Sequence, residues 1–192
     1  MFRLRLFTQK NLVTLVPWFK SERRTPEPAL RHFTLEDLEN CYRAHSHIYT
    51  DGSVTSTSSA IGVSIPSDNV TISATLSHRT SSSATEQAAL RAAIHYIIDQ
   101  TAESWVIFTD SRATRKSTQD QLVMDIKRLS KKACDLHSRI VLQRIPAHCG
   151  IQGNIRADDP VKAGHDTSAE IAEIPFSRQY AATLVFAHAW HP

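Results

Sequence analysis

The fold is set by two similar stretches of sequence, Ile48-Tyr49-Thr50-Asp51-Gly52-Ser53 and, farther along the chain, Phe108-Thr109-Asp110-Ser111. In each, an apolar run ends in Thr-Asp and is followed by a small residue. Short apolar runs of this kind are typical of buried strands, and small residues mark the turns that follow them. Each stretch therefore predicts a buried strand that ends in a carboxylate.

Two further acids stand near the starts of predicted helices. Glu86 lies in Thr85-Glu86-Gln87, which opens a helix with apolar periodicity, and Asp158 lies just inside the last predicted helix. With Asp51 and Asp110, they place four acids at the ends of four separate elements, where they can converge. Converging carboxylates repel one another and destabilise a fold unless a cation lies among them. Such a set is typical of a Mg²⁺ site for phosphodiester cleavage.

The hydrophobic pattern around these acids predicts an α/β fold. Alternating apolar and polar residues indicate strands, and apolar residues at helical spacing indicate helices. Three strands, then helices alternating with strands, indicate a mixed sheet with helices packed on its faces. Before them, Thr34 is the predicted N-cap of a short helix. The predicted strands are 48–51, 59–65, 70–76, 105–108 and 140–145, and the predicted helices are 86–100, 122–136 and one capped by Asn154 that runs toward Lys162.

Length and composition allow one domain of ordinary size with extensions. The chain has 192 residues, of which 41% are hydrophobic and 21% are charged, so a packed core is expected. Its net charge is only +3 with histidine neutral. This mildly basic balance permits a polyanionic partner without requiring one.

Cysteine usage and hydropathy point to the interior of the cell, in the cytoplasm or nucleus. Cys41, Cys134 and Cys149 have no paired spacing, and an odd count without a framework is typical of a reducing compartment. No apolar run approaches the roughly 20 residues of a membrane-spanning helix. We therefore expect no membrane partner, and the oligomeric state stays open.

Four blocks of this sequence resemble the signature blocks of ribonuclease H, in that family's order and at its spacing. They are Tyr-Thr-Asp-Gly-Ser (49–53), Ala-Thr-Glu-Gln-Ala-Ala-Leu (84–90), Phe-Thr-Asp-Ser-Arg-Ala (108–113) and Ile-Pro-Ala-His-Cys-Gly-Ile-Gln-Gly-Asn (145–154). Their residues are most similar to those of the ribonuclease H domains of non-LTR retrotransposon polyproteins, which follow a reverse transcriptase. One block alone would be weak, whereas four in order are a specific signal.

This resemblance implies a ribonuclease-H-like fold and a division of the chain into three parts. The implied sheet has five strands, three antiparallel and then two parallel, with helices on both faces. Its first and fourth strands lie side by side, which would bring Asp51 and Asp110 together. Residues 47–165 would form the domain, 1–46 an extension or linker from an upstream reverse transcriptase, and 166–192 a loosely attached tail.

The resemblance also implies an activity: a Mg²⁺-dependent endonuclease that cuts the RNA strand of RNA–DNA hybrids and leaves 5′-phosphate ends. Two Mg²⁺ ions, with Mn²⁺ as an alternative, would be held by Asp51, Glu86, Asp110 and Asp158. Asp51 would bridge the ions. Whether Asp158 or its neighbour Asp159 is the fourth ligand stays open. His148 would assist proton transfer or product departure.

Substrate contacts are expected next to the acids. A glycine lets a nucleic-acid backbone approach closely, and serines near a helix N-terminus can donate to phosphate, although plain loop composition explains these serines equally well. Four basic residues on the helix 122–136 either form its solvated face or reach the hybrid electrostatically. The expected substrate-binding residues are Gly52, Ser53, Ser82, Ser83, Ser111, Arg112 and Asn154.

Three positions depart from the pattern of the resembling family, and they leave alternatives open. Ile155 stands where glutamate is usual, Pro160 where leucine is usual, and Arg144 where an aromatic residue is frequent. Pro160 inside a helix would remove a hydrogen bond and strain the segment that carries Asp158. Arg144 would bury a charge or force its strand outward. The alternatives are a catalytically impaired, domesticated or decayed domain that only binds nucleic acid, and, more weakly, a related nuclease that acts on DNA.

Overall fold

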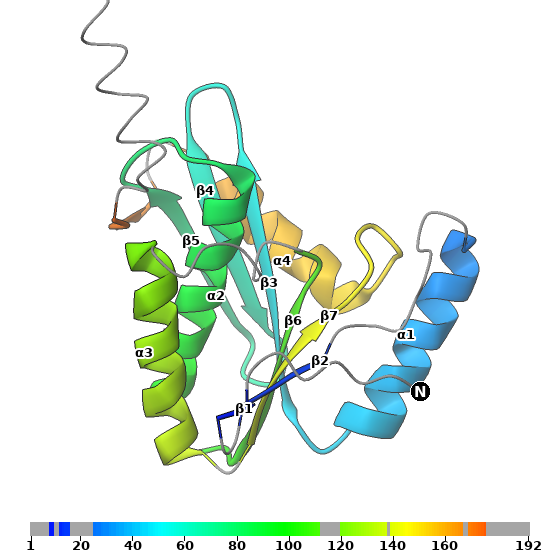
Figure 1. The fold of residues 1–192 in the computed structure, drawn as a ribbon. Helices are drawn as coiled ribbons and strands as arrows, with labels where there is room; N and C mark the ends of the chain where they lie inside the picture. Colours follow the sequence, from blue (N-terminus) through cyan, green and yellow to red (C-terminus); the bar gives the residue numbers. More distant parts are fainter. Residues whose placement is uncertain are drawn as a thin grey trace, which may run out of the picture.

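The computed structural model describes residues 8–9, 12–15, 25–111, 120–137, 139–166 and 169–175, the first two ranges by their backbone alone. In this part of the chain, eight strands form one sheet in the order β1-β2-β7-β6-β3-β4-β5-β8 (Figure 1). None of the helices in these ranges has the length and apolar character needed to cross a bilayer. The strands are β1 (Thr8–Gln9), β2 (Leu12–Leu15), β3 (Ser46–Val54), β4 (Ser59–Ile65), β5 (Val70–Leu76), β6 (Ser104–Thr109), β7 (Arg139–Arg144) and β8 (Ile171–Ala172).

The five central strands confirm the predicted mixed sheet. β3, β4 and β5 form an antiparallel meander, β6 pairs in parallel with β3, and β7 pairs in parallel with β6. Every residue of β4 is buried, because this strand lies inside the sheet and is covered on both faces. The predicted strand 48–51 is part of the longer β3, which continues past Asp51.

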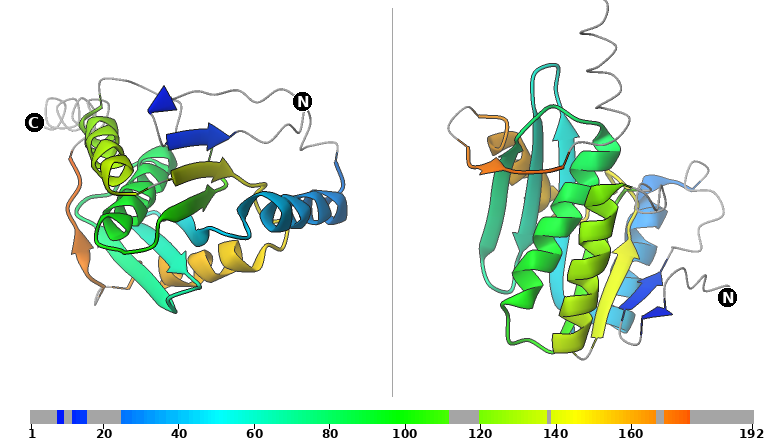
Figure 2. Two further views of the ribbon diagram at one scale, coloured as in Figure 1. Left: turned by 90° about the horizontal axis from the view of Figure 1, so that it is seen from below. Right: turned by 60° about the vertical axis from the view of Figure 1, so that its left-hand side comes forward.

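Helices cover both faces of the sheet, as Figure 2 shows. On one face, α2 and α3 enclose a core that contains Ile48, Ile97 and Trp105. On the other face, α1 and α4 pack with Tyr49 and Phe108. Ile48 and Tyr49 are neighbours in β3 and point to opposite faces, which is the period of two expected of a strand. The helices are α1 (Glu27–Tyr42), α2 (Ser82–Ile98), α3 (Gln121–Leu136) and α4 (Gln152–Ala163).

The sheet extends beyond the five predicted strands at both edges. β2 pairs in parallel with β7, and β8 pairs in parallel with β5. Thr75 donates its backbone N–H to Glu170 O at 2.8 Å, and Ser77 donates to Ala172 O at 3.0 Å. The loose attachment expected for residues after 165 is therefore wrong for Ile171–Ala172. Backbone groups make these edge contacts, so side-chain patterning gives little sign of them.

Two predicted helix caps are also wrong. α1 begins at Glu27, next to Pro28, because proline suits the first turn of a helix, where its missing N–H would have no partner. Thr34 lies inside α1, where its Oγ1 donates to Leu30 O at 2.7 Å. α4 begins at Gln152 after Ile151, so Asn154 lies in its first turn rather than at its cap.

Glycines bring α4 close to the sheet. A Cβ on Gly62 would lie 2.3 Å from Ala157 O, and a Cβ on Gly153 would lie 2.1 Å from the ring of Tyr49. Pro160 lies inside α4, as predicted, yet the helix continues past it to Ala163. The carbonyl of Pro160 accepts a hydrogen bond from Ser73 Oγ at 2.6 Å. This contact ties α4 to β5 at Pro160.

Gly62→Ala is expected to destabilise the protein by about 1–3 kcal/mol, the usual cost of overpacking. The added methyl meets backbone atoms of α4, which cannot rotate away. Chemical denaturation followed by circular dichroism measures the change. Gln152→Ala, at an exposed position of the same helix, is the control and should be nearly neutral. A stable Gly62→Ala protein would show that α4 sits farther from β4 than described.

Candidate active site

The parallel pairing of β3 with β6 places two aspartates side by side. In this register Thr50 lies opposite Thr109, so the next residues, Asp51 and Asp110, lie at the same end of adjacent strands. The Oγ1 of Thr50 donates to Phe108 O at 3.2 Å, and Tyr49 stacks on Phe108 with ring centroids 4.9 Å apart. Burial of these residues holds the register, because a slip by one residue would turn every side chain to the other face.

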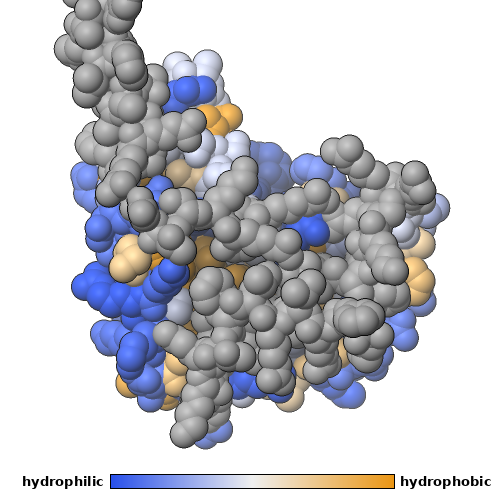
Figure 3. Space-filling model, viewed as in Figure 1, coloured by the Kyte–Doolittle hydropathy of each residue, from blue (hydrophilic) through white to orange (hydrophobic). Residues whose placement is uncertain are grey.

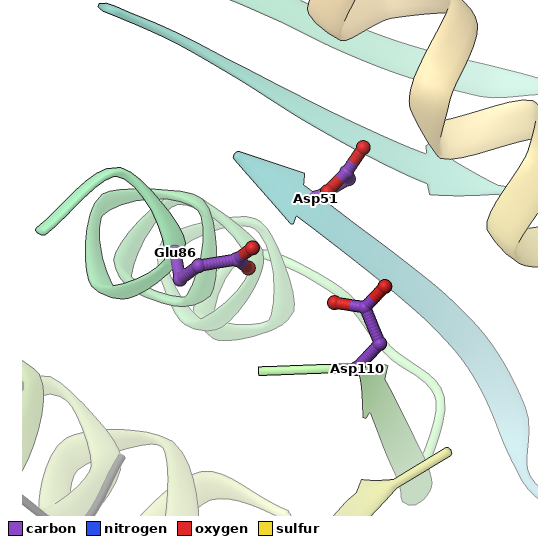
Figure 4. A group of neighbouring side chains, drawn as sticks. All are labelled: Asp51, Glu86 and Asp110. Carbon is purple, nitrogen blue, oxygen red and sulfur yellow. The ribbon is translucent and has the colours of Figure 1, made fainter. Parts of the chain in front are cut away.

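Glu86 reaches the same place from α2. Ser81 caps this helix, and its Oγ accepts from the N–H of Ala84 at 3.3 Å. β3 approaches α2 at Gly52, where a Cβ would lie 2.6 Å from Thr85 C and 2.7 Å from Glu86 N. One carboxylate oxygen from each of Asp51, Glu86 and Asp110 lies within 4.8 Å of the others. Figure 4 shows the three side chains turned toward one another.

Burial raises the pKa of all three carboxyl groups, and the charges of neighbouring acids add to this effect at Glu86 and Asp51. Burial, then the charges of Asp110 and Asp51, raise the pKa of Glu86 to about 9. Burial and the charge of Asp110 raise the pKa of Asp51, although Asp51 Oδ1 accepts a hydrogen bond from Gly52 N–H at 2.8 Å. Burial also raises the pKa of Asp110. Holding all three ionised therefore requires a positive charge among them.

The donor set fits a hard divalent cation such as Mg²⁺. Mg²⁺ prefers oxygen ligands, and all three groups offer carboxylate oxygens. Glu86 Oε2 is buried and has no hydrogen-bond partner among the residues that the structure describes. A buried carboxylate oxygen without a partner is costly unless a ligand completes it. We therefore assign these three acids as a candidate metal centre.

Asp158 lies beside the cluster rather than within it. Its side chain is 48% exposed, and its Oδ2 accepts from Lys162 Nζ at 2.7 Å. The charge of Asp158 nevertheless raises the pKa of Asp51. Asp159 has a side chain that is 75% exposed and lies 3.8 Å from the same Lys162 nitrogen. Of the two aspartates, Asp158 is the one whose charge acts on Asp51.

Three other polar residues surround Asp110. The side chain of Asn154 hydrogen-bonds to the Asp110 carboxylate and lowers its pKa, while Asn154 Oδ1 is buried without a partner among the described residues. His148 is exposed in a left-handed conformation (φ 52°), and its charge lowers the pKa of both Asp51 and Asp110. Arg144 Nε donates to the backbone carbonyl of Asp110 at 3.2 Å.

Arg144 is a site residue that sequence reasoning missed. It was expected to bury a charge or push its strand outward, but it is only half-buried and stays paired with Thr109 in the sheet. Its charge lowers the pKa of Asp110, after larger effects from His148 and Asn154. The available signal was position: Arg144 ends the strand that runs parallel to the strand before Asp110.

Comparison with known protein families identifies the family of this chain. The RNase H family model matches residues 43–166, about two-thirds of the chain. The chain belongs to the RNase H family. Among curated proteins, no match was found.

Solved structures of RNase H1 proteins resemble this RNase H. LC11-RNase H1, isolated from compost, shares 22% identity at a TM-score of 0.50, over 63% of this chain and 95% of that chain. LC11-RNase H1 in complex with an RNA/DNA hybrid shares 20% identity at a TM-score of 0.49, over 61% and 94%. RNase H1 from the archaeon Halobacterium salinarum shares 19% identity at a TM-score of 0.47, over 62% and 96%. At these identities the likeness concerns the fold.

The expected substrate-binding residues of this RNase H differ in their exposure to solvent. Ser53, Ser83 and Ser111 are partly buried, and Ser82 is exposed at the first turn of α2. The open side of Gly52, expected to admit nucleic acid, is filled by the backbone of α2. Ile155, one of the three departures, is 45% exposed on α4. Arg112 lies outside the described residues.

The basic residues of α3 form an exposed, mixed-charge surface. Lys131 pairs with Asp135 at 2.8 Å, and Arg128 pairs with Asp125 at 3.6 Å, both within the helix. Figure 3 shows hydrophilic side chains over this side of the molecule, where α3 lies in Figure 1. Neighbouring acids offset part of the positive charge, which favours a solvated face over a dedicated phosphate-binding surface.

Glu86→Gln is expected to stabilise the metal-free protein at pH 8. The pKa of Glu86 is raised from 4.5 to about 9 on folding, so between these values the folded state holds a proton that the unfolded state has lost. The free energy of unfolding therefore falls as pH rises through this window. The variant lacks this loss and should be more stable by at least about 1 kcal/mol. Denaturant unfolding at pH 5 and pH 8 with a chelator measures it.

The control for this experiment is Glu103→Gln, which changes an exposed acid. It should show the wild-type dependence on pH. Equal slopes for wild type and Glu86→Gln between pH 5 and pH 8 would contradict the raised pKa.

Gly52→Ala is expected to weaken binding of divalent cations about 10- to 100-fold, the usual effect of disturbing groups that support metal ligands. The new methyl would displace the backbone of Thr85 and Glu86. Calorimetric titration with Mn²⁺ measures the affinity, and Ser53→Ala is the neighbouring control. Unchanged affinity in a folded Gly52→Ala protein would show that the close approach of β3 and α2 does not position Glu86.

Proposed function

We propose that this chain is a Mg²⁺-dependent endonuclease that hydrolyses the RNA strand of RNA–DNA hybrids and leaves 5′-phosphate and 3′-hydroxyl ends. The observation that carries the proposal is the convergence of Asp51, Glu86 and Asp110, with a buried Glu86 oxygen that has no partner among the described residues. Membership of the RNase H family supports the reaction class. One RNase H1 structure of similar fold is a complex with an RNA/DNA hybrid.

In this proposal the acids of β3, α2 and β6 hold the metal, and Asp158 completes the site from α4. Mg²⁺ when bound supplies Lewis-acid activation of water and stabilises the leaving oxygen, in the two-metal form if two ions bind. Asn154 orients the Asp110 carboxylate through its side-chain hydrogen bond. Arg144 fixes the backbone at Asp110. His148, exposed at the rim, holds or moves a proton during departure of the product.

Substrate selection would rest on the RNA strand's 2′-hydroxyl groups, since these distinguish RNA from DNA. The first turn of α2, which precedes Glu86, carries the exposed Ser82 and the partly buried Ser83. Helix N-termini bind phosphate through free N–H groups. We propose that this turn, with Ser53, Ser111 and Arg112, contacts the backbone of the hybrid.

The biological setting is also a proposal. The residues of the four signature blocks support an origin in a non-LTR retrotransposon, in which the domain would follow a reverse transcriptase and remove template RNA. The family match begins at residue 43, so a joint to an upstream domain would lie in the segment before it. The helix α1 belongs to that segment.

A specific observation supports a second candidate, a module that binds nucleic acid without cutting it. Lys162 Nζ lies 2.7 Å from Asp158 Oδ2, where a metal would have to compete for the carboxylate. Pro160 lies in the same helix. An exposed ion pair of this type is weak, typically under about 1 kcal/mol, so a divalent cation can displace it. We therefore favour the enzyme.

The deciding measurement is cleavage of a labelled RNA–DNA hybrid by purified protein in Mg²⁺, beside the Asp110→Asn variant. We expect hybrid cleavage by the wild type and a fall of at least about 100-fold in the variant, because even groups that only support metal ligands cost 10- to 100-fold. Asp135→Asn, an exposed acid paired with Lys131, is the matched control and should cut normally.

The other outcomes separate the candidates. A folded wild-type protein that binds the hybrid, does not cut it, and binds it equally after Asp110→Asn would be the binding module. Cleavage of a DNA duplex but not of the hybrid would indicate the weaker alternative, a nuclease of related fold that acts on DNA. Circular dichroism on the same samples excludes loss of folding as the cause.

A further inference from the structure

The helix α1 lies outside the RNase H family match yet packs beside the site. It spans Glu27–Tyr42, and the match begins at residue 43. Figure 1 shows α1 next to the loop that joins β7 to α4, and this loop carries His148. A helix that served only as a linker would not need to bury side chains against this loop.

The first contact between α1 and the loop is apolar. Leu30 is 8% exposed and belongs to the same buried cluster as Ile145, Cys149 and Ile151. Cys149 follows the exposed His148, and Ile151 follows the half-buried Gly150; their exposed fractions are only 2% and 3%. The side chains around the exposed tip of the loop are therefore held in a core to which α1 contributes.

The second contact is polar. Arg31 Nε donates to the backbone carbonyl of Gly150 at 3.3 Å. Gly150 and His148 both have positive φ, 74° and 52°. Left-handed backbone is unfavourable for a residue such as histidine and persists only when its surroundings hold it. Arg31 thus ties down the loop two residues after His148, whose conformation is the unfavourable one.

The far end of α1 contacts the other side of the site. Tyr42 donates to Gln143 Oε1 at 2.8 Å, and Gln143 Nε2 donates to Arg144 O at 2.7 Å. Arg144 in turn donates to the backbone carbonyl of Asp110. α1 is therefore connected both to the loop with His148 and to the end of the strand that leads to Asp110.

We propose that α1 is part of the catalytic scaffold, and that Leu30 and Arg31 are positioning residues that act through His148. The inference rests on the proposed function for its kinetic part. It goes beyond the family domain, because it assigns a role in the reaction to residues that lie outside the family match. The two residues keep His148 in its left-handed conformation at the rim of the acidic cluster.

The test compares Arg31→Ala with Arg43→Ala, the same change at an exposed arginine next to α1 that pairs only with Glu39 among the contacts described. Leu30→Ala is compared with Leu35→Ala, since Leu35 is 43% exposed on the same helix. Amide hydrogen exchange at residues 147–151 is measured first, because it does not depend on activity. We expect faster exchange there in Arg31→Ala and Leu30→Ala, and wild-type exchange in both controls.

The kinetic arm uses the hybrid substrate with and without His148→Ala. Losing one hydrogen bond of this kind should lower kcat of Arg31→Ala about three- to tenfold, with KM unchanged. The same substitution should have no further effect in the His148→Ala background, and Arg31→Lys should recover part of the rate. An equal loss in both backgrounds, or unchanged exchange at 147–151, would overturn the proposal. If the wild type does not cut hybrid, the proposed function fails, and the exchange measurement still decides whether α1 holds the loop.

Discussion

The parallel pairing of β3 with β6 is the contact on which the rest of the structure depends. It aligns Thr50 with Thr109 and so brings Asp51 and Asp110 to the same edge of the sheet. Buried Ile48 and Tyr49 pack on opposite faces and fix this register. The hydrophobic effect of the central strands thus supplies the free energy that holds two like charges together.

At the candidate site, the packing of the fold brings together acidic groups that repel one another when ionised. Partial burial raises the pKa of all three carboxyl groups, and the charges of Asp110 and Asp51 help to raise the pKa of Glu86 to about 9. Close backbone packing holds Glu86 beside Asp51, because Gly52 of β3 lies against the backbone of Thr85 and Glu86 in α2. A larger side chain at position 52 would displace the backbone of Glu86 and so move its carboxyl group away from the two aspartates. A divalent cation would convert the repulsion into ligand bonds, which couples metal binding to stability.

Much of the central domain could be predicted from the chain. The hairpin strands 59–65 and 70–76 match the structure because period-two alternation and a clear turn define them. The predictions fail where backbone hydrogen bonds or neighbouring elements determine where a helix begins or which strands join the sheet. Thr34 and Asn154 have the chemistry of helix caps, yet Pro26–Pro28 and Ile151 mark where the helices begin. β8 and β2 join the sheet through backbone hydrogen bonds, to which side-chain pattern contributes little.

For the site, the acids Asp51, Glu86 and Asp110 are identifiable in the sequence because each stands where a predicted strand ends or a helix opens, and the family blocks surround them. Their pattern predicts the type of site but not the distances between the carboxylate oxygens. Only the folded chain reveals three further contacts. They are the ion pair of Lys162 with Asp158, the hydrogen bond from Arg144 to the carbonyl of Asp110, and the hydrogen bond from Arg31 of α1 to the loop that carries His148. These contacts join residues on different elements or depend on helix geometry. The packing of α1 and α4 on the sheet determines which residues meet.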